Sequence, residues 1–599
     1  MKKLKSFFST LLLFLAVLFA QNSWGQTMVG SGQTYTTLKA AFDAINNGTL
    51  SGNIVLQITS STTETATAVL NASGSGSASY TSVAIYPTGS GYSISGSVTG
   101  ALIQLNGADN VTIDGRVSQS GAKDLIIQNA NTSNATIQLT ADATYNTVKY
   151  CVIKGATTST SNGIVLISAG TSSGNDNNTI DNNDINGNAS AVNCIYATGS
   201  SGIVNNAVTV SNNNIYDFRG AGSNGIYLYS YNSDWTIDGN SIYQTTSYTG
   251  VSGTTYGIQI GSTGLGNGFV IQNNKIGGSS ANCTGTWTIN GTATTFRFQG
   301  ISINVGTSTA SSIQNNTIKG FSWLSSSGAG TVPGVWCGIN IASGLANVGN
   351  ITGNIIGSTT GTGSITANVT TTAAVSFGIA NASTSANIIS KNSIGSITVT
   401  GNTTSISHGF VGIVTSSSGN TTISNNTIGS TSTSNSINAS TASTNTNGQP
   451  VVGIWSSSTG TVTINNNIVA NINNAYGGTG TSTFFGQLRG ILVGTALSTS
   501  VAEISTGVSV VGNSIYNLTS AIPYTSTSQT SAVIGLCVLA NSTSVSSTIS
   551  QNFIYGITST ANAVTELDGI FVKTGTLSSG SNLIEKTLFI VLQQLLRVQ

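Results

Sequence analysis

The chain has 599 residues and is rich in Ser, Thr, Asn and Gly, with only 6% charged residues and a net charge of +1. A charge so close to zero gives no electrostatic reason to expect binding to nucleic acid or to an anionic membrane. The low charge does not predict disorder, because Ile and Val recur at regular intervals and can bury a small core in each repeat.

The N-terminus has the pattern of a secretory signal peptide. Lys2, Lys3 and Lys5 precede the apolar stretch 7–20, which is too short for a comfortable membrane span. We expect residues 1–25 to be removed by cleavage after Gly25, with cleavage after Ala20 as the alternative. The mature chain is then predicted to have no membrane span and to be secreted or displayed on the outer cell surface.

Residues 26–100 are predicted to form an N-terminal cap and the first coils of a repeat. A helix is expected at 35–47, because its apolar residues follow the i, i+3, i+4, i+7 spacing. These residues are Leu38, Ala41, Phe42 and Ile45. Thr36 or Thr37 can cap this helix and Gly48 can end it. With the strand that follows at 53–59, the helix is predicted to cover the open end of the stack.

One short pattern occurs eleven times between residues 179 and 557: an apolar residue, two variable residues, Asn, one variable residue and Ile. Asn tolerates the left-handed backbone that a corner needs, and stacked Asn amides can bond from coil to coil. The pattern predicts an all-β fold, a right-handed parallel β-helix solenoid over residues 101–585. The predicted ladder residues are Asn183, Asn213, Asn240, Asn274, Asn316, Asn354, Asn392, Asn426, Asn466, Asn513 and Asn552.

A second pattern, Gly-Ile or once Gly-Leu, alternates with the first. The distance from each Gly to the next Asn unit is mostly 11 to 14 residues, whereas the rest of each repeat varies freely in length. Insertions are therefore expected on one face of a solenoid. Some fourteen coils at about 4.8 Å each predict a rod of roughly 65–70 Å. The Gly residues are Gly225, Gly257, Gly300, Gly338, Gly378, Gly412, Gly453, Gly490, Gly535 and Gly569.

The repeats resemble the right-handed parallel β-helix repeats of the pectin-lyase-like superfamily. The segments 35–45, 84–91 and 105–116 further resemble large secreted surface proteins of Bacteroidetes, many of them cargo of the type IX secretion route. The resemblance covers nearly the whole mature chain. It implies the fold, but it does not imply an activity, because this fold carries lyases, hydrolases and non-catalytic adhesins.

The distribution of acidic residues argues against catalysis in the central coils. Between Asp238 and Glu503 the sequence contains no Asp or Glu. Glycoside hydrolysis usually needs two carboxyl groups, and calcium-assisted chemistry needs several acidic ligands. The single His, His408, is expected in a solvated loop, with a catalytic role as the alternative.

The acidic residues that remain lie in the early coils. Asp176, Asp181 and Asp184 fall in one run rich in Asp and Asn, which resembles the composition of calcium ligands but lacks the spacing of a known calcium loop. We expect them to replace Asn at corners, with weak calcium binding as the alternative. No other cofactor is expected.

Aromatic residues are the other candidate for a binding site. Trp287 and Trp323 lie in two neighbouring variable segments, and Arg297 lies between them. Exposed Trp rings stack on sugars, and Arg297 can add hydrogen bonds. Phe298 and Trp336 stand two residues before their Gly, which favours an internal position for those two rings.

These observations predict a non-catalytic secreted or cell-surface protein that acts in adhesion or polysaccharide contact through loops on one face. Its expected partner is a polysaccharide or a cell-surface glycan. The alternative is a polysaccharide lyase or glycoside hydrolase that uses the Asp-rich early coils.

The C-terminal segment 586–599 departs from the repeat. After Ser581–Lys586 the pattern requires Asn-x-Ile, but the chain continues as Thr587–Gln599, without Gly, Asn or Ser. Restoring one A to a run of A in a matching nucleotide string gives Asn-Phe-Ile and a Ser/Thr-rich loop. We therefore expect that a frameshift truncates a longer protein with further coils and, by resemblance, a sorting domain. The tail is expected as a poorly packed extension or a short helix.

Overall fold

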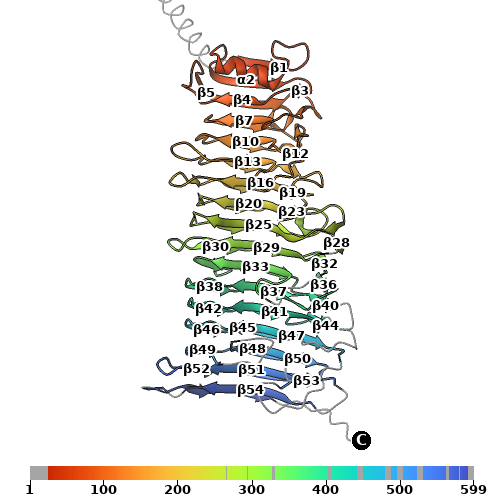
Figure 1. Ribbon diagram of the computed structural model, residues 1–599, viewed down its shortest axis with the longest axis vertical. Coiled ribbons are helices and arrows are strands. Elements are labelled where there is room, and N and C mark those ends of the chain that lie inside the picture. Colours follow the sequence, from red (N-terminus) through yellow and green to blue (C-terminus); the bar gives the residue numbers. More distant parts are fainter. Residues whose placement is uncertain are drawn as a thin grey trace, which may run out of the picture.

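The computed structural model describes residues 25–590 except 265, 293, 327–330, 402–406, 442–448, 479–486, 496–502, 523–530, 562–564, 576 and 579–580. The predicted signal peptide therefore lies outside the described residues, apart from Gly25. Parallel strands stack into three long sheets, and the chain winds through them as a right-handed parallel β-helix (Figure 1). The predicted fold class is confirmed.

Each coil passes through the three sheets in the same order, which we name sheet A, sheet B and sheet C. Sheet A contains β1 (Gly25–Val29), β2 (Gly52–Ile58), β5 (Tyr80–Pro87), β8 (Val111–Asp114), β11 (Thr147–Lys149), β14 (Thr179–Asp181), β18 (Thr209–Ser211), β22 (Thr236–Asp238), β26 (Val270–Gln272), β30 (Ser311–Gln314), β34 (Ala346–Val348), β38 (Asn387–Ser390), β42 (Thr421–Ser424), β46 (Val462–Asn465), β49 (Val508–Val511), β52 (Thr548–Ser550) and β55 (Leu583–Glu585).

Sheet B contains β3 (Thr62–Glu64), β6 (Ser93–Gly96), β9 (Ile126–Asn129), β12 (Val152–Gly155), β15 (Asp184–Asn186), β19 (Asn214–Tyr216), β23 (Ser241–Tyr243), β27 (Lys275–Ile276), β31 (Thr317–Ile318), β35 (Ile355–Gly357), β39 (Ser393–Gly395), β43 (Thr427–Gly429), β47 (Ile468–Ala475), β50 (Ser514–Ser520), β53 (Phe553–Ser559) and β56 (Leu588–Ile590).

Sheet C contains fifteen strands: β4 (Ala68–Asn71), β7 (Ile103–Asn106), β10 (Ile137–Thr140), β13 (Val165–Ile167), β16 (Asn193–Thr198), β20 (Asn224–Ser230), β25 (Gly253–Thr263), β29 (Phe296–Asn304), β33 (Trp336–Ser343), β37 (Ala374–Asn381), β41 (His408–Thr415), β45 (Val451–Ser456), β48 (Leu488–Val493), β51 (Val533–Ala540) and β54 (Leu567–Thr574).

From residue 248 onward the coils gain one more strand after sheet B. We call this the side stack: β24 (Tyr248–Gly250), β28 (Trp287–Thr292), β32 (Phe321–Ser325), β36 (Ile365–Val369), β40 (Ile397–Gly401) and β44 (Ile437–Ser440). It joins β47, whose first half pairs with β43 and whose second half pairs with β44. Smaller elements are the pair β17 (Asn205–Asn206) and β21 (Asn232–Ser233), and the short 3₁₀ turns Val117–Gln119 and Ala281–Cys283.

The single helix longer than one turn among the described residues is α2 (Leu38–Asn46), at the N-terminal end of the stack (Figure 1). The hydroxyl of Thr37 accepts a hydrogen bond from the Ala40 N–H at 3.1 Å, so Thr37 is the N-cap. The buried carboxylate of Glu64 accepts the N–H groups of Leu38 at 2.9 Å and Lys39 at 3.1 Å. The predicted apolar face is buried against the core. That α2 protects this end of the stack stays a prediction.

Ten of the eleven predicted Asn residues form one continuous buried ladder at the corner between sheets A and B. The backbone N–H and the side-chain amide of each Asn donate to the Oδ1 of the Asn one coil further on. For Asn316 and Asn354 both distances are 2.9 Å. The ladder begins where the Cys151 N–H donates to Asn183 Oδ1, and it runs to Asn552.

The eleventh prediction, Asn466, is wrong by one residue. Asn467 is the ladder member, bonded to Asn426 and Asn513, whereas Asn466 is exposed. The sequence Asn466-Asn467-Ile468 matches the pattern one residue early, but Val469 is the residue in register with Ile428. The expected left-handed backbone also belongs to the residue before the ladder Asn, as at Asn425 and Asn466, with φ of 56° and 55°.

The Gly of the Gly-Ile pattern is required by close packing between coils. A Cβ at Gly378 would lie 2.5 Å from the Gly412 carbonyl oxygen and 2.8 Å from the Ile394 side chain. The same two kinds of neighbour surround Gly338 and Gly412. The pattern therefore marks a row of sites in sheet C where only a hydrogen fits.

Where the side stack begins, the wider coil is filled by aromatic side chains. Trp287, Phe298, Phe321 and Trp323 are all buried, with ring centroids between 4.6 and 6.4 Å apart. Trp336 stacks on Phe298 at 5.8 Å. The internal position expected for Phe298 and Trp336 is confirmed.

The C-terminal tail differs from its prediction in its first residues. Leu588–Ile590 forms β56, which pairs in register with β53. Phe589 stands opposite Ile554, but Leu588 is 53% exposed and Phe589 37% exposed, so the strand continues the ladder while its apolar side chains are poorly packed. Residues 591–599 lie outside the described residues.

Candidate functional site

The two tryptophans predicted as exposed sugar contacts lie in the core. Trp287 is 0% exposed and Trp323 is 1% exposed. The indole N–H of Trp323 donates to the Phe296 carbonyl at 3.0 Å, and the two rings stack at 4.7 Å. The prediction is wrong because the side stack widens the coil here, and the added interior must be filled by large side chains.

The third residue of that prediction, Arg297, points the other way. It lies on β29 between the buried Phe296 and Phe298, and is itself partly exposed. To the residues that the structure describes, its side chain makes no hydrogen bond or ion pair. Arg297 is therefore separated by the strand from the tryptophans with which it was grouped.

The three calcium candidates do not converge on one point. Asp181 lies on sheet A and accepts hydrogen bonds from Ser211 at 2.7 Å and Asn182 at 2.8 Å. Asp184 lies on sheet B, 2.6 Å from Lys123 Nζ, and Asp176 accepts the Asn206 N–H at 2.7 Å. Among the described residues no three His, Cys, Asp or Glu side chains are grouped to hold a metal ion. The geometry gives calcium binding no support.

The arrangement of carboxylates meets the requirement for catalysis only in part. Asp181 and Asp238 lie in one outward row of sheet A with Ser211 between them, about 10 Å apart over two coil steps. Burial alone would raise the pKa of Asp181, but the hydrogen bonds from Ser211, Asn182 and Asn212 lower it. Asp181 therefore stays ionised at neutral pH and is a poor general acid.

The same row continues toward the N-terminus with Lys149 and Asp114. Lys149 stands beside Asp181, and its Nζ is 3.6 Å from Asp114 Oδ2. Arg116 binds both carboxylate oxygens of Asp114, at 2.9 and 2.7 Å. Asp217, in contrast, lies at the corner after β19, where it accepts the N–H of Thr245 at 2.9 Å.

His408 is buried rather than solvated. It begins β41, is 0% exposed, and its Nε2 lies 2.8 Å from Ser376 Oγ. Burial lowers its pKa to about 4. A neutral, inaccessible imidazole bonded to a buried hydroxyl is a structural group, so both the solvated loop and the catalytic alternative are wrong.

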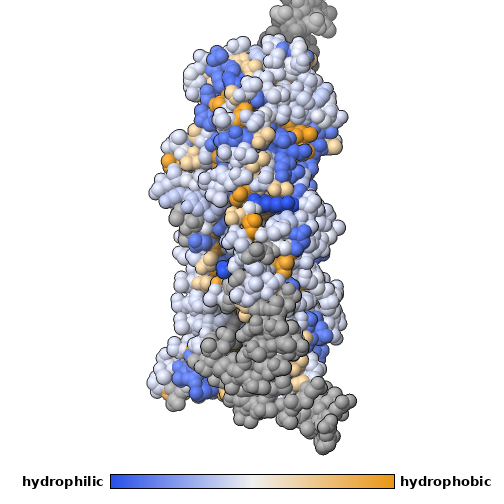
Figure 2. Space-filling view, turned by 45° about the vertical axis from the view of Figure 1, so that its right-hand side comes forward, coloured by the Kyte–Doolittle hydropathy of each residue, from blue (hydrophilic) through white to orange (hydrophobic). Residues whose placement is uncertain are grey.

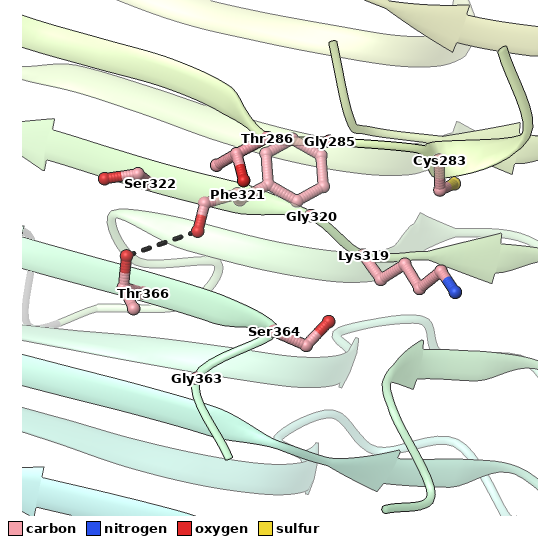
Figure 3. A pocket seen from close by; sticks show the side chains of 10 residues that line it. All are labelled: Cys283, Gly285, Thr286, Lys319, Gly320, Phe321, Ser322, Gly363, Ser364 and Thr366. Atoms are coloured by element: carbon pink, nitrogen blue, oxygen red, sulfur yellow. Dashed lines mark hydrogen bonds between the residues drawn. The ribbon is translucent and has the colours of Figure 1, made fainter. Parts of the chain in front are cut away.

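A solvent-open pocket of about 470 Å³ lies at the corner where sheet B leads into the side stack (Figure 3). Lys319, Ser322, Ser364 and Thr366 line it with one ammonium and three hydroxyl groups. Thr366 Oγ1 donates to the Phe321 carbonyl at 3.2 Å. Of the ten residues that line the pocket, none carries a carboxylate.

Two further properties of this pocket bear on its ligand. Lys319 Nζ has no hydrogen bond or ion pair to any described residue, so its charge is available to a ligand. Cys283, on the upper side in Figure 3, is buried, its thiol faces the Thr317 carbonyl at 3.6 Å, and burial raises its pKa to about 11. The pocket is therefore polar and cationic, without a reactive thiolate.

The pocket lies in a belt of the rod that has no acidic residue. Residues 239–502 contain Lys275, Arg297, Lys319, Lys391 and Arg489 but no Asp or Glu, a formal charge of +5. On the face in Figure 2, strongly hydrophilic side chains gather in separate groups between paler regions. The absence of acid is visible in the sequence, but Lys319 could not be singled out there, because one Lys in a variable segment gives no pattern.

Comparisons with known proteins give similarity in structure alone. No family model matches the chain, and no curated relative matches it. The A-module of a mannuronan C-5 epimerase from Azotobacter vinelandii matches with TM-score 0.34 and 12% identity over 84% of this chain and 92% of that one. A PL6 family polysaccharide lyase from Pseudopedobacter saltans matches with TM-score 0.29 and 11% identity over 85% and 88%. Similarity this low carries no argument about activity.

The helices in the described part of the chain are short. The longest helix there, α2, has nine residues, and none is both long and apolar enough to cross a bilayer.

Proposed function

We propose that this is a secreted or cell-surface β-helical protein that binds polysaccharide without cleaving it, through the pocket around Lys319. The observation that carries this proposal is the ammonium of Lys319, which no described residue pairs, in an open pocket that hydroxyl groups also line. Hydroxyls and an ammonium provide both donors and acceptors for sugar hydroxyls, and the ammonium favours sugars that bear a carboxylate or sulfate.

The absence of acid in residues 239–502 supports binding rather than hydrolysis. In most glycosidases one carboxyl group protonates the leaving oxygen and a second activates water or attacks the sugar. No carboxyl group lines the pocket, and Asp238, one coil before the lining residues Cys283 and Thr286, lies on sheet A and not at this corner. Secretion is supported by the pattern of residues 1–25, which precede the first described strand.

Affinity electrophoresis tests the proposal. The protein from residue 26 onward is run through gels that contain alginate, polygalacturonate or a sulfated galactan, against gels without polysaccharide. Retardation by at least one of them is expected, with no release of reducing ends or unsaturated products during overnight incubation.

Lys319→Ala should weaken that retardation about tenfold, as expected for the loss of one charge-assisted hydrogen bond. Lys391→Ala is the matched control, because Lys391 lies in the same belt and carries the same charge, but on another corner, where its Nζ bonds the Ile351 carbonyl. Equal effects of the two variants would mean that net charge, not the pocket, holds the polymer.

The alternative, a polysaccharide lyase or glycoside hydrolase, is favoured by one observation. Asp114, Lys149 and Asp181 follow one another along sheet A on three successive coils. If incubation releases products and Lys149→Ala abolishes their release while leaving the fold intact, the enzyme hypothesis replaces the binding one.

A further inference from the structure

Three tyrosines form a continuous aromatic surface on the outer face of sheet C, well away from the Lys319 pocket. Tyr196 lies on β16, and Tyr227 and Tyr229 lie on β20. Tyr227 pairs in register with Tyr196, and the two rings meet edge to face at 5.5 Å. Tyr229 stacks on Tyr196 at 6.1 Å and meets Tyr227 edge to face at 5.6 Å. We call this set the tyrosine face.

The tyrosine face does not belong to the core. Tyr196 packs with Ala101, Ala135 and Leu166, an apolar group separate from the interior of the coils. Tyr227 is partly exposed, and Tyr229 is 36% exposed. All three rings therefore rest on the outside of the sheet, where Tyr227 and Tyr229 reach solvent and Tyr196, 3% exposed, lies beneath them.

The polar groups of this surface are free for a ligand. None of the three phenol hydroxyls has a hydrogen bond to a residue that the structure describes. Burial raises the pKa of Tyr227 to about 12, so its hydroxyl is protonated at neutral pH and can both donate and accept.

The neighbours in the same outward row carry no charge, and two of them are amides. Along the row, Tyr196 follows Leu166 and Gln138, and Tyr227 is followed by Gln259 and Ser302. Neutral amides beside aromatic rings recognise hydroxyl groups and the C–H face of a sugar ring, whereas nucleic acid or an acidic polymer would be met by cations. The row runs along the axis of the rod, from β10 to β29 near the middle of Figure 1.

We infer that the tyrosine face is a second binding site, for a neutral polysaccharide chain that lies along the rod. It is distinct from the Lys319 pocket in both place and chemistry. A protein that holds one polymer by charge and another by aromatic stacking can join two polysaccharides. This inference rests on the proposed function only because both sites are proposed to bind glycans.

The test uses the protein from residue 26 onward in gels that contain a neutral β-glucan, xyloglucan or galactomannan. Retardation by at least one neutral polymer is expected. Tyr227→Ala and Tyr229→Ala should each weaken it about tenfold, because each removes one ring from the contact. Tyr227→Phe keeps the ring and should retain most of the binding.

Tyr216→Ala is the matched control. Tyr216 is a partly exposed tyrosine on sheet B, where its ring stacks on Tyr243 at 5.1 Å. The Tyr216→Ala variant should bind neutral polymer as well as the unchanged protein does. Thermal unfolding of all variants shows whether any loss comes from misfolding. Lys319→Ala should leave neutral binding unchanged, so failure at one site is distinguishable from failure at the other.

Three outcomes would overturn the inference. The first is that no neutral polysaccharide retards the folded protein. The second is that Tyr227→Ala and Tyr229→Ala bind as well as Tyr216→Ala. The third is that both variants lose binding to a protein partner, such as a second copy of this chain, and not to any glycan.

Discussion

The Oδ1 atom of Asn426 accepts two hydrogen bonds from Asn392, one from its backbone N–H and one from its side-chain amide, both at 2.9 Å. The Asn392 amide also donates to the Val348 carbonyl at 3.1 Å, in the coil before. One side chain therefore bonds to the coils on both sides of its own.

Removing such a side chain should destabilise the fold by more than the loss of its own hydrogen bonds. Asn392→Ala leaves the Val348 carbonyl and the Asn354 amide groups buried without partners, at about 1–3 kcal/mol for each unsatisfied group. We expect a clear fall in the urea midpoint of unfolding. The sharper comparison lies between Asn467→Ala, which removes a ladder member, and Asn466→Gly, which removes an exposed neighbour while keeping its left-handed backbone. Equal loss in these two variants would contradict the assignment of Asn467.

The Gly row should be equally sensitive to a single methyl group. Gly378→Ala places a Cβ 2.5 Å from a backbone oxygen that cannot move away, so we expect destabilisation by about 1–3 kcal/mol. Gly291→Ala is the control, because its nearest neighbour would be 3.7 Å away. The Gly291→Ala variant should have the same urea midpoint of unfolding as the parent, or a slightly higher one. A tolerated Gly378→Ala would mean that the coils can separate locally.

The aromatic filling of the widened coils predicts a loss of stability without a loss of binding. Trp323→Ala empties a site buried on all sides and should cost about 3–5 kcal/mol. Under conditions where the variant remains folded, its retardation by acidic polysaccharide should match that of the parent. Selective loss of polysaccharide binding in the folded variant would restore the sugar-contact hypothesis for this tryptophan.

The buried imidazole of His408 should make stability depend on pH. Burial lowers its pKa from 6.5 to about 4, so between these values the unfolded chain binds a proton that the folded chain does not. Stability contributed by neutral His408 is therefore present above pH 6.5 and is lost as pH falls toward 4, by about 3 kcal/mol over the whole window. Unfolding at pH 7.5 and pH 5 measures the difference, and His408→Gln should reduce it. An unchanged difference in the variant would show that other groups cause it.

The repeat could be predicted because its constraints are periodic. The ladder Asn and the Gly of the Gly-Ile pattern each occupy one position per coil, so each copy reinforces the same interpretation. Only Asn466 was misplaced, where three Asn residues in succession make the register ambiguous. The side stack was not predicted, because it begins within the segments of variable length. Trp287 and Trp323 were assigned to the surface for that reason.

The candidate sites could not be found by the same route. Neither Lys319 nor Tyr229 recurs at the same position in other coils, and the role of each depends on the residues that adjacent coils place beside it. Residues as far apart in sequence as Cys283 and Thr366 line one pocket. The sequence shows the repeat period of the solenoid. It does not show which residues lie beside a residue that departs from the repeat.

The direction of the Asn ladder has a consequence for how such a chain acquires its structure. From Asn183 to Asn513 each ladder Asn donates its backbone N–H and its side-chain amide forward to the next Asn, so a newly folded coil lacks these two acceptors until the next coil arrives. However many coils have formed, a single corner is unsatisfied at the growing end. The free-energy cost of a pause is therefore independent of length, and a chain that emerges N-terminus first can fold coil by coil, each new turn completing the one before it.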